Sequence, residues 1–239
     1  MKIAVLYICT GKYTVFWDRF HAGCERFFLP SHQKEYFVFT DGELGSGASG
    51  QVHRVQQENL GWPGNTLMRF HMFSRVADQL RAFDLCFFFN ANMDFVQTVG
   101  DEFLPTDEEG LLVVRHPGYC RVPYEEGGKL PYERRPESSA YVPLWHPGYY
   151  VCGGLNGGYT ASYLELVSAL RRAIDIDLEH NVVAQWHDES HLNRYILGRP
   201  CKINSPEYAF PEGWRLPCVP KIVILDKSRY GGHDFLRGK

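Results

Sequence analysis

The sequence lacks the features by which membrane, secreted and nucleic-acid-binding proteins are usually recognised. Its longest apolar runs, at 3–9 and 85–89, are far shorter than the ~20 residues of a membrane-spanning helix, and we find no secretory leader. The seven cysteines include no C-x-x-C pair, which argues against a disulfide framework or a zinc knuckle and indicates a reducing compartment. With 25 Lys and Arg against 28 Asp and Glu, the formal charge of −3 provides no global positive field for nucleic acid or an anionic membrane.

Several catalytic signatures are also missing. The glycine- and serine-rich stretch DGELGSGASG, 41–50, is not followed by G-K-[ST], so we expect a surface loop there rather than a phosphate-binding P-loop. No G-x-S-x-G occurs, and no G-x-G-x-x-G opens a helix after the first predicted strand. These absences exclude hydrolases of the serine type and dinucleotide-dependent oxidoreductases.

What the sequence does contain is the pattern of an α/β protein. A composition of 44% hydrophobic and 15% aromatic residues is typical of a folded globular chain, and no repeat or long linker divides it, so we expect one domain over 1–239. Apolar and β-branched runs predict strands at 1–9, 36–41, 52–55, 84–89, 111–116, 149–152 and 221–225. Because helical patterns alternate with these runs, we expect a sheet in which parallel pairing dominates.

Apolar residues at helical spacing predict helices at 17–28, 65–83, 162–179 and 188–197. The helix at 65–83 would be one long element that carries Arg69 on its surface, away from its apolar stripe. The pair Ser162 and Glu165 matches a capping box and predicts the start of the third helix.

Asn90 and Asn92 follow the strand at 84–89, at the edge of an α/β sheet where ligands usually bind. Residues two apart in extended backbone point the same way, so the two amides could address one ligand. Asparagines also end strands and form turns with no further role. The pair alone does not decide between these interpretations.

The segment WHDESH, which begins at Trp186, places two histidines four residues apart near a predicted helix start. A zincin helix has Glu directly after its first His, whereas Asp188 stands there and Glu189 follows, so a zinc hydrolase on His187 and His191 is a less favoured alternative. Carboxylates in a first helical turn also complement the helix dipole, which is a structural explanation. The neighbouring indole favours a sugar site, because its face packs on C–H groups while carboxylates accept hydrogen bonds from hydroxyls.

Two further segments are candidates for ligand binding. The glycines of GGLNGG, 153–158, follow a predicted strand and lack side chains that would keep a bulky ligand from the backbone. The basic tail at 220–239 carries Lys227, Arg229 and Arg237 around paired glycines. We interpret it either as a frayed end or as a mobile lid over a phosphate group.

Seven blocks of the sequence together resemble glycosyltransferase family 6, which includes the histo-blood-group A and B transferases and α-1,3-galactosyltransferase. The blocks are LYICTGKY (6–13), FVFTD (37–41), NANMDF (90–95), RHPGY (115–119), YERRPESSAYVP (132–143), CGGLNGG (152–158) and WHDESHLNRY (186–195). The resemblance implies a GT-A fold with a Rossmann-like mixed sheet in a single catalytic domain. It also implies a UDP-sugar donor and transfer of galactose or N-acetylgalactosamine to O3 of a galactose, with retention of the α configuration.

The resemblance assigns roles to individual residues. Donor binding falls on Tyr13, Trp62, Arg69, Asn90, Asn92, Cys152, Gly153, Gly154, Asp188, Lys227 and Arg229. Acceptor binding falls on His116, Trp186 and Glu189. Glu189 also matches the family's catalytic glutamate, Tyr13 would stack on uracil, and Lys227 would grip the pyrophosphate.

The animal members bind Mn²⁺ through a D-x-D pair, which here reads Asn90, Ala91, Asn92. Hard divalent cations are held chiefly by ionised carboxylates, and an amide brings no charge. We therefore expect a metal-independent transferase that needs no divalent-metal cofactor. The basic residues of the tail, or the amides themselves, would then stabilise the leaving UDP.

Other departures concern the substrates and the location. Cys152 and Gly154 stand where the A and B enzymes differ, and Gly154 leaves room for an acetamido group, so we expect UDP-GalNAc rather than UDP-Gal. Pro131 and Pro211 replace hydrogen-bonding residues on the acceptor side, so a fucosylated galactoside is only one option. Because the chain starts at its first predicted strand, without the signal anchor of the animal members, we expect a cytoplasmic bacterial protein with no membrane anchor.

Two questions of chemistry stay open at this point. Glu189 could be the nucleophile of a double displacement, or it could stabilise an oxocarbenium-like transition state while the departing phosphate accepts the acceptor's proton. A lectin-like module that binds glycans and has lost catalysis is the alternative function. The basic tail favours an enzyme, because a lectin has no use for cations that bind pyrophosphate.

Overall fold

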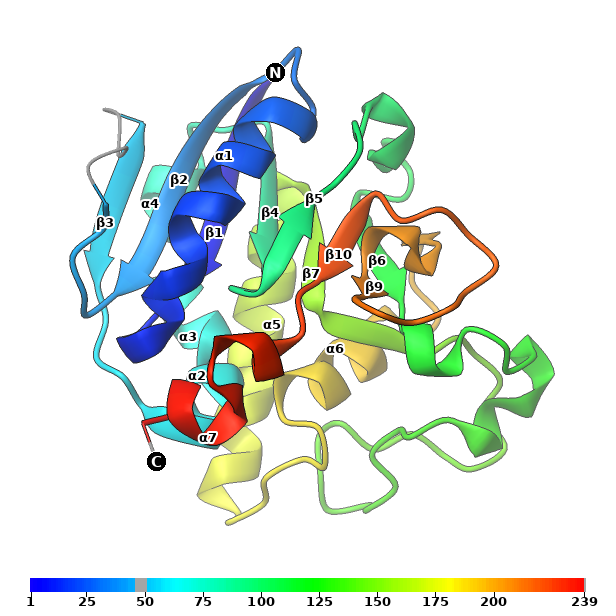
Figure 1. Ribbon diagram of the computed structural model, residues 1–239. Coiled ribbons are helices and arrows are strands. Elements are labelled where there is room, and N and C mark those ends of the chain that lie inside the picture. Colours follow the sequence, from blue (N-terminus) through cyan, green and yellow to red (C-terminus); the bar gives the residue numbers. More distant parts are fainter. Residues whose placement is uncertain (46–50, 239) are drawn as a thin grey trace.

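The computed structural model describes residues 1–45 and 51–238, so the predicted loop at 41–50 lies outside it from residue 46 onward. Within the described residues, seven strands form one sheet in the order β3-β2-β1-β4-β7-β6-β8 (Figure 1). These strands are β1 (Lys2–Ile8), β2 (Gln33–Thr40), β3 (Val52–Gln56), β4 (Leu85–Phe89), β6 (Leu111–Arg115), β7 (Val151–Tyr159) and β8 (Lys202–Asn204). Only β7 runs antiparallel to its neighbours among these described strands, so the sheet is mixed and consistent with a GT-A-like glycosyltransferase fold.

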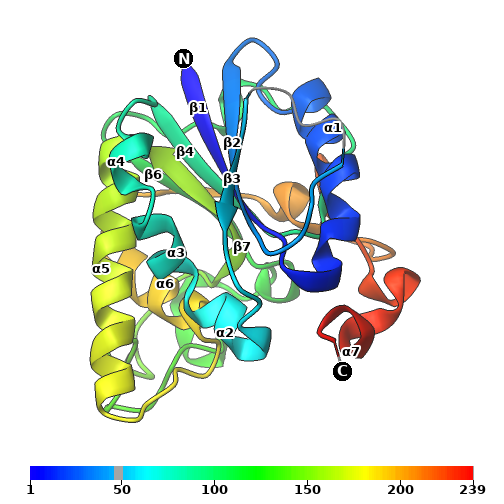
Figure 2. The ribbon, with the colours of Figure 1, turned by 90° about the vertical axis from the view of Figure 1, so that its left-hand side faces the viewer.

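Helices cover both faces of the sheet (Figure 2). Side chains along a strand alternate between its faces: Ile3, Val5 and Tyr7 of β1 belong to one core, and Ala4 and Leu6 to the other. The first core packs under α1 (Trp17–Phe27) and the second under α2 (Gly61–Leu67), α3 (Arg69–Ser74), α4 (Ala77–Leu80), α5 (Thr160–Glu179) and α6 (Asp188–Ile196). Burial on both faces explains why the central strands are continuous apolar runs.

The single helix predicted over 65–83 is wrong, because the chain forms α2, α3 and α4 there. The backbone leaves helical geometry at Met68 (φ −89°, ψ 12°) and at Val76 (φ −112°, ψ 10°). The apolar stripe packs on the sheet as expected, but Arg69 is buried rather than on the surface. The break between α2 and α3 lies directly before this arginine, whose side chain points into the protein.

Two predicted boundaries also move. The strand predicted over 149–152 continues through the glycines as β7, and a Cβ at Gly157 would lie 2.2 Å from a ring carbon of Phe87. Strand packing therefore requires that glycine.

Helix α5 begins at Thr160, before the predicted capping box, where the Thr160 N–H donates to the carbonyl of Asp84 (3.0 Å). A tertiary contact, and not the capping box, therefore sets the start of this helix.

A second, three-stranded sheet brings the C-terminal tail to the end of β4. It consists of β5 (Met93–Phe95), β10 (Ile222–Ile224) and β9 (Phe210–Pro211), with β10 in the middle. The tail then continues into the 3₁₀ helix η6 (Lys227–Tyr230) and α7 (Gly232–Leu236). Because β5 follows the Asn90–Asn92 segment directly, its pairing with β10 carries the basic tail to that segment.

The segment 116–150 crosses the molecule without a strand and is stabilised by a small core of its own, formed by Leu130, Tyr132, Val142 and Tyr150. The remaining short elements are the 3₁₀ helices η1 (Gly11–Phe16), η2 (Asp101–Phe103), η3 (Pro117–Tyr119), η4 (Tyr124–Lys129) and η5 (Pro206–Tyr208). None of the helices in the described parts of the chain has the length and apolar character to cross a membrane.

Candidate active site

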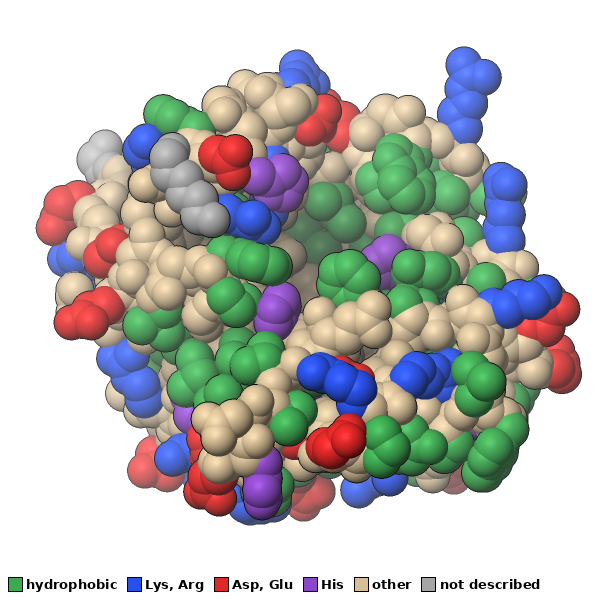
Figure 3. Space-filling view, turned by 90° about the horizontal axis from the view of Figure 1, so that it is seen from below, with side chains coloured by type: hydrophobic (Ala, Val, Ile, Leu, Met, Phe, Trp, Pro, Cys, Tyr) green, Lys and Arg blue, Asp and Glu red, His purple; other side chains and the backbone are tan. Residues whose placement is uncertain are grey.

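A cavity of about 210 Å³ lies at the carboxyl ends of β1 and β4, where an open α/β sheet commonly binds ligands. Polar and aromatic groups from four segments line it, among them Thr10, Tyr13, Trp62, Arg69, Asn90, Asn92, Lys227 and Arg237. Viewed from below, the surface is hollowed beside the C-terminal tail (Figure 3). The structure thus brings most of the predicted donor-binding residues to one place.

Asn90 and Asn92 belong to a turn rather than to extended backbone. The Met93 N–H donates to the carbonyl of Asn90 (3.1 Å), which reverses the chain between β4 and β5. The Asn92 amide donates to the carbonyl of Leu225 (2.9 Å), and the Leu225 N–H donates back to the Asn92 carbonyl (2.8 Å). The two asparagines therefore form a turn and also line the cavity, and Asn92 joins the tail to it.

Arg69 connects the cavity to the carboxylates of α6. Its Nη1 lies 2.6 Å from the carbonyl oxygen of Gly153 and 2.7 Å from Oδ2 of Asp188, and its Nη2 lies 3.3 Å from Oδ1 of Asn90. Arg69 is 5% exposed and its partner Asp188 is 1% exposed. A buried arginine in this position holds β7, the Asn90 turn and the start of α6 in fixed relation.

Asp188 and Glu189 form the first turn of α6 and both have raised pKa values. Burial raises the pKa of Asp188 to about 6, although the charge of Arg69 opposes this shift. Burial likewise raises the pKa of Glu189 to about 7, against the lowering effect of the Gly153 N–H, which donates to Oε2 at 2.7 Å. Oδ2 of Asp188 pairs with Arg69, whereas Oδ1 has no hydrogen-bond partner among the described residues and can accept a hydroxyl group.

Asn193 fixes α6 against β7. Its amide donates to the carbonyls of Val151 (2.8 Å) and Glu189 (2.9 Å), and its Oδ1 accepts the Val151 N–H (2.9 Å). This residue is fully buried, so all of its polar contacts are internal. It therefore determines how far Glu189 stands from the strand that carries Gly153.

The tail closes one side of the cavity with cations over aromatic rings. Lys227 Nζ lies 5.3 Å from the ring centre of Tyr13, and the Arg237 guanidinium lies 4.7 Å from that of Trp62. Burial, together with the charge of Arg237, lowers the pKa of Lys227 to about 8. Arg229, which is also predicted to bind the donor, is not in the lining of the cavity. It pairs with Glu212 on the surface instead.

The predicted acceptor residues lie beyond Glu189. The rings of His116 and Tyr150 are 5.8 Å apart, and the Tyr150 hydroxyl lies beside Glu189. Burial lowers the pKa of His116 to about 4, and its Nδ1 accepts the Gly118 N–H (3.1 Å), so the neutral ring carries its proton on Nε2. Trp186 is 45% exposed, as an aromatic surface for a sugar would be.

The predicted specificity residues lie on β7. Cys152 is buried in the first core and is outside the lining of the cavity. Gly153 contacts the α6 carboxylates, as its hydrogen bond to Glu189 shows. A Cβ added to Gly154 would lie 3.0 Å from the side-chain amide nitrogen of Asn90. Gly154 therefore lies next to a residue that lines the cavity.

The residues of the site do not form a typical divalent-metal centre. Asn90 offers a neutral oxygen that already accepts from Arg69, and the Asn92 amide group is used by Leu225. Across residues 1–45 and 51–238, no three His, Cys, Asp or Glu side chains are arranged to hold a metal ion. His191 instead lies 3.6 Å from Asp177, and His187 packs against Trp62, which gives the zinc-hydrolase alternative no support.

Some residues of the site carry no mark in the sequence. Thr10 and Asn65 are bonded to each other (3.0 Å) at the rim of the cavity, and Tyr150 and Asn193 support Glu189. Asn193 belongs to the WHDESHLNRY block, so the block was a signal for it. Thr10 likewise belongs to the LYICTGKY block. Asn65 and Tyr150 lie in none of the blocks, and Tyr150 acts on Glu189, which is far away in the sequence.

The known proteins that this chain resembles in sequence are glycosyltransferases. The O-antigen biosynthesis glycosyltransferase WbnI of Escherichia coli is 36% identical over 230 residues, which are 96% of both chains. Histo-blood group ABO system transferase 1 of Rattus norvegicus is 33% identical over 92% of this chain and 62% of its own. Globoside alpha-1,3-N-acetylgalactosaminyltransferase 1 of Mus musculus is 32% identical over 93% of this chain and 65% of its own.

This chain thus matches somewhat less than two thirds of the length of those two animal relatives. The sequence model of glycosyltransferase family 6 matches residues 1–230. The chain belongs to glycosyltransferase family 6, as the seven sequence blocks indicate.

Proposed function

We propose that this glycosyltransferase moves N-acetylgalactosamine from UDP-GalNAc to O3 of a galactoside, with retention of the α configuration and without a metal ion. The observation that carries the proposal is the chain of contacts from the cavity through Arg69 to Asp188 and, by way of Gly153, to Glu189. It joins a basic, aromatic pocket suited to a nucleotide to two carboxylates suited to a sugar, of which Asp188 is buried and Glu189 half-buried. Such a pairing is what a nucleotide-sugar donor requires.

The tail cations support donor binding. Lys227 and Arg237 line the cavity beside Tyr13 and Trp62, so a stacked base and a pyrophosphate fit the same space. Asn90 and Asn92 contribute amide groups where the animal members have carboxylates. Neutral amides do not repel phosphate oxygens as carboxylates would. We infer that cations of the protein take the stabilising role that Mn²⁺ has in the animal members.

Glu189 acts at the anomeric carbon in this proposal. Its carboxylate accepts the Gly153 N–H near the start of β7, and Oδ1 of Asp188 beside it accepts a hydrogen bond from a hydroxyl of the donor sugar. When its carboxyl group is ionised, Glu189 either attacks the anomeric carbon or stabilises positive charge there. His116, neutral and with Nε2–H free to donate, binds an acceptor oxygen.

Gly154 supports the choice of N-acetylgalactosamine. The position has no side chain, and even one methyl group would come within 3.0 Å of Asn90. A side chain at this position would push the Asn90 amide, which lines the cavity, toward the acetamido group of the bound donor. The acceptor is proposed only as a galactoside, of which a fucosylated galactose is one form.

The experiment is an incubation of the purified protein with UDP-GalNAc or UDP-Gal and a panel of galactosides in chelator-treated buffer, followed by mass and linkage analysis. We expect an α-1,3-linked GalNAc product and no large gain from added Mn²⁺. A rate that rises by orders of magnitude with Mn²⁺ would contradict metal independence. Binding of galactosides without any turnover, under all donors, would favour the lectin-like alternative.

A further inference from the structure

The loop that precedes α6 is held in an unfavourable backbone conformation. His187, directly before Asp188, has φ 53° and ψ −126°, a left-handed geometry that residues with a Cβ seldom adopt. Local hydrogen bonds support the turn, since the His187 N–H donates to Ala184 O (2.9 Å) and the Glu189 N–H to Trp186 O (3.0 Å). Such a conformation persists only where neighbouring residues hold it in place. Contacts from another segment of the chain to residues 183–187 can do this.

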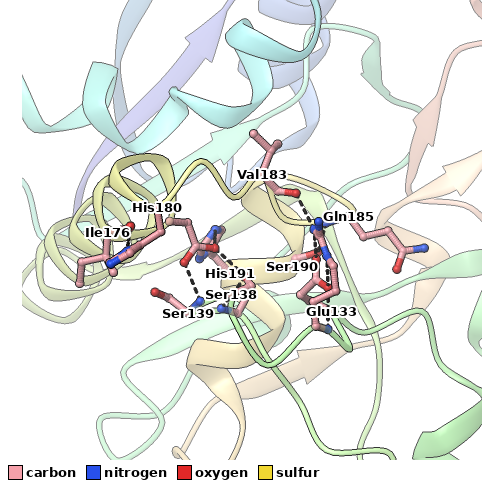
Figure 4. A network of polar contacts seen from close by, with 12 residues as sticks. Glu133, Ser138, Ser139, Ile176, His180, Val183, Gln185, Ser190 and His191 are labelled. Atoms are coloured by element: carbon pink, nitrogen blue, oxygen red, sulfur yellow. Dashed lines mark hydrogen bonds and ion pairs between the residues drawn. The ribbon is translucent and has the colours of Figure 1, made fainter.

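Glu133 is the main outside contact of this loop. Its carboxylate is buried, and its Oε2 accepts the Gln185 N–H at 2.7 Å (Figure 4). Arg135 clamps the same carboxylate through Nε (3.0 Å) and Nη2 (2.8 Å), and Nη2 also donates to the carbonyl of Val183 (2.6 Å). The pair therefore bonds to the loop at two alternate backbone positions.

The base of this clamp is itself rigid. Arg134 donates to the carbonyls of Val142 (2.8 Å), Pro143 (2.7 Å) and Gly127 (2.7 Å), which closes the 127–143 segment on itself. Asp177, near the end of α5, accepts from the Ser138 hydroxyl (2.5 Å) and the Ser139 N–H (2.6 Å). The segment that carries Glu133 is thus tied to α5 as well as to the loop after it.

We propose that Glu133, held by Arg135, is a positioning residue that fixes the 183–187 loop and thereby the place of Glu189 in the site. Glu133 contacts neither the cavity lining nor Glu189, so it acts through the loop alone. Without the clamp, His187 relaxes toward ordinary φ values, and the first turn of α6 moves and admits water. The partial burial of Glu189 is then lost.

The test compares Glu133→Gln with Glu137→Gln, a matched change at an exposed residue of the same segment. We expect faster hydrogen exchange in peptides covering 181–187 for Glu133→Gln only. We also expect its kcat to fall by roughly 10-fold or more while the affinity for UDP stays the same, because the tail and Tyr13 are untouched. The acidic limb of its rate–pH profile moves to lower pH, because water around Glu189 lowers the pKa of that carboxyl.

Arg135→Lys provides a second variant if Glu133→Gln does not fold. It keeps the charge but loses the bidentate contact, and it should give the same effects more weakly. Unchanged exchange at 181–187, or a lower kcat with an unmoved acidic limb, would overturn the inference. Only the rate measurements rest on the proposed function. If the wild-type protein transfers no sugar, the exchange data still decide about the clamp.

Discussion

At the scale of single residues, Glu189 determines the chemistry. Burial raises its pKa to about 7, so a large fraction of this carboxyl is protonated at neutral pH and below. A nucleophile or an anionic stabiliser must be ionised. We expect the rate to rise with pH through about 7, and kcat/KM measured against pH checks this.

Replacement of the same residue tests its role directly. Glu189→Gln keeps the shape and the oxygen that accepts from Gly153 N–H, but it removes the charge. We expect a loss on the order of 10²-fold or more in kcat with the UDP affinity retained, measured by steady-state kinetics and calorimetry. Near-normal turnover would remove Glu189 from the mechanism.

Lys227 should take up a proton when UDP binds. Its pKa is lowered to about 8 by burial and by Arg237, and a pyrophosphate close by would favour the ammonium form. At pH 8 we expect an uptake of roughly half a proton, measured by calorimetry in two buffers with different ionisation enthalpies. The control is Lys227→Arg, which stays charged and should bind UDP without uptake; equal uptake in both proteins would assign the proton to another group.

Gly154 is expected to set the preference between donors. The methyl group of Gly154→Ala would press on Asn90 at about 3.0 Å and reduce the space for an acetamido group. One methyl group in a tight pocket typically changes selectivity by about 10- to 200-fold. We therefore expect the ratio of kcat/KM for UDP-GalNAc to kcat/KM for UDP-Gal to decrease by a factor in that range. An unchanged ratio would move the specificity determinant elsewhere.

At the scale of elements, the tail is organised by the pairing of β10 with β5. That pairing ends beside Asn92, and η6 and α7 then fold across the cavity. Arg237 points to Trp62, whereas Arg229 pairs with Glu212. The two arginines share one short segment and the same charge, so they form a natural control for each other.

From this arrangement we expect Arg237→Ala to weaken UDP binding by about 10-fold and Arg229→Ala to change it less than twofold. A charge-assisted contact to phosphate is worth roughly 1.5 kcal/mol or more, while an exposed ion pair is worth little. Isothermal titration with UDP distinguishes the two. Equal losses would mean that the tail rearranges when the nucleotide binds.

At the scale of the whole molecule, the cavity lies where the large sheet, the small sheet and the tail meet. A nucleotide bound there contacts the end of the large sheet, the 59–69 segment and the tail, so it stabilises the folded chain by mass action. At a UDP concentration of about 100 Kd this amounts to about 2.7 kcal/mol, which raises the melting temperature by several degrees. We expect this shift in chelator-treated buffer, and a shift that requires Mn²⁺ would contradict the metal-independent proposal.

The element order could be predicted because its signal is local. In β1, the alternation of Ile3, Val5 and Tyr7 with Ala4 and Leu6 is present in the sequence, and it corresponds to two cores on two faces. The helix over 65–83 failed for the opposite reason. Its apolar stripe is local, but the inward turn of Arg69 depends on Asp188 and Gly153, which lie far along the chain.

The sequence by itself determined the α/β class, the membership of the family and several of the residues that line the cavity, because periodicity and motif blocks are properties of neighbouring residues. Only the tertiary structure decided that Asn92 binds Leu225, that Arg237 and not Arg229 lines the cavity, and that Glu133 supports the loop before Asp188. Those contacts join segments tens of residues apart. Buried polar groups find partners only after the chain has packed, and no local pattern records which partner each will meet.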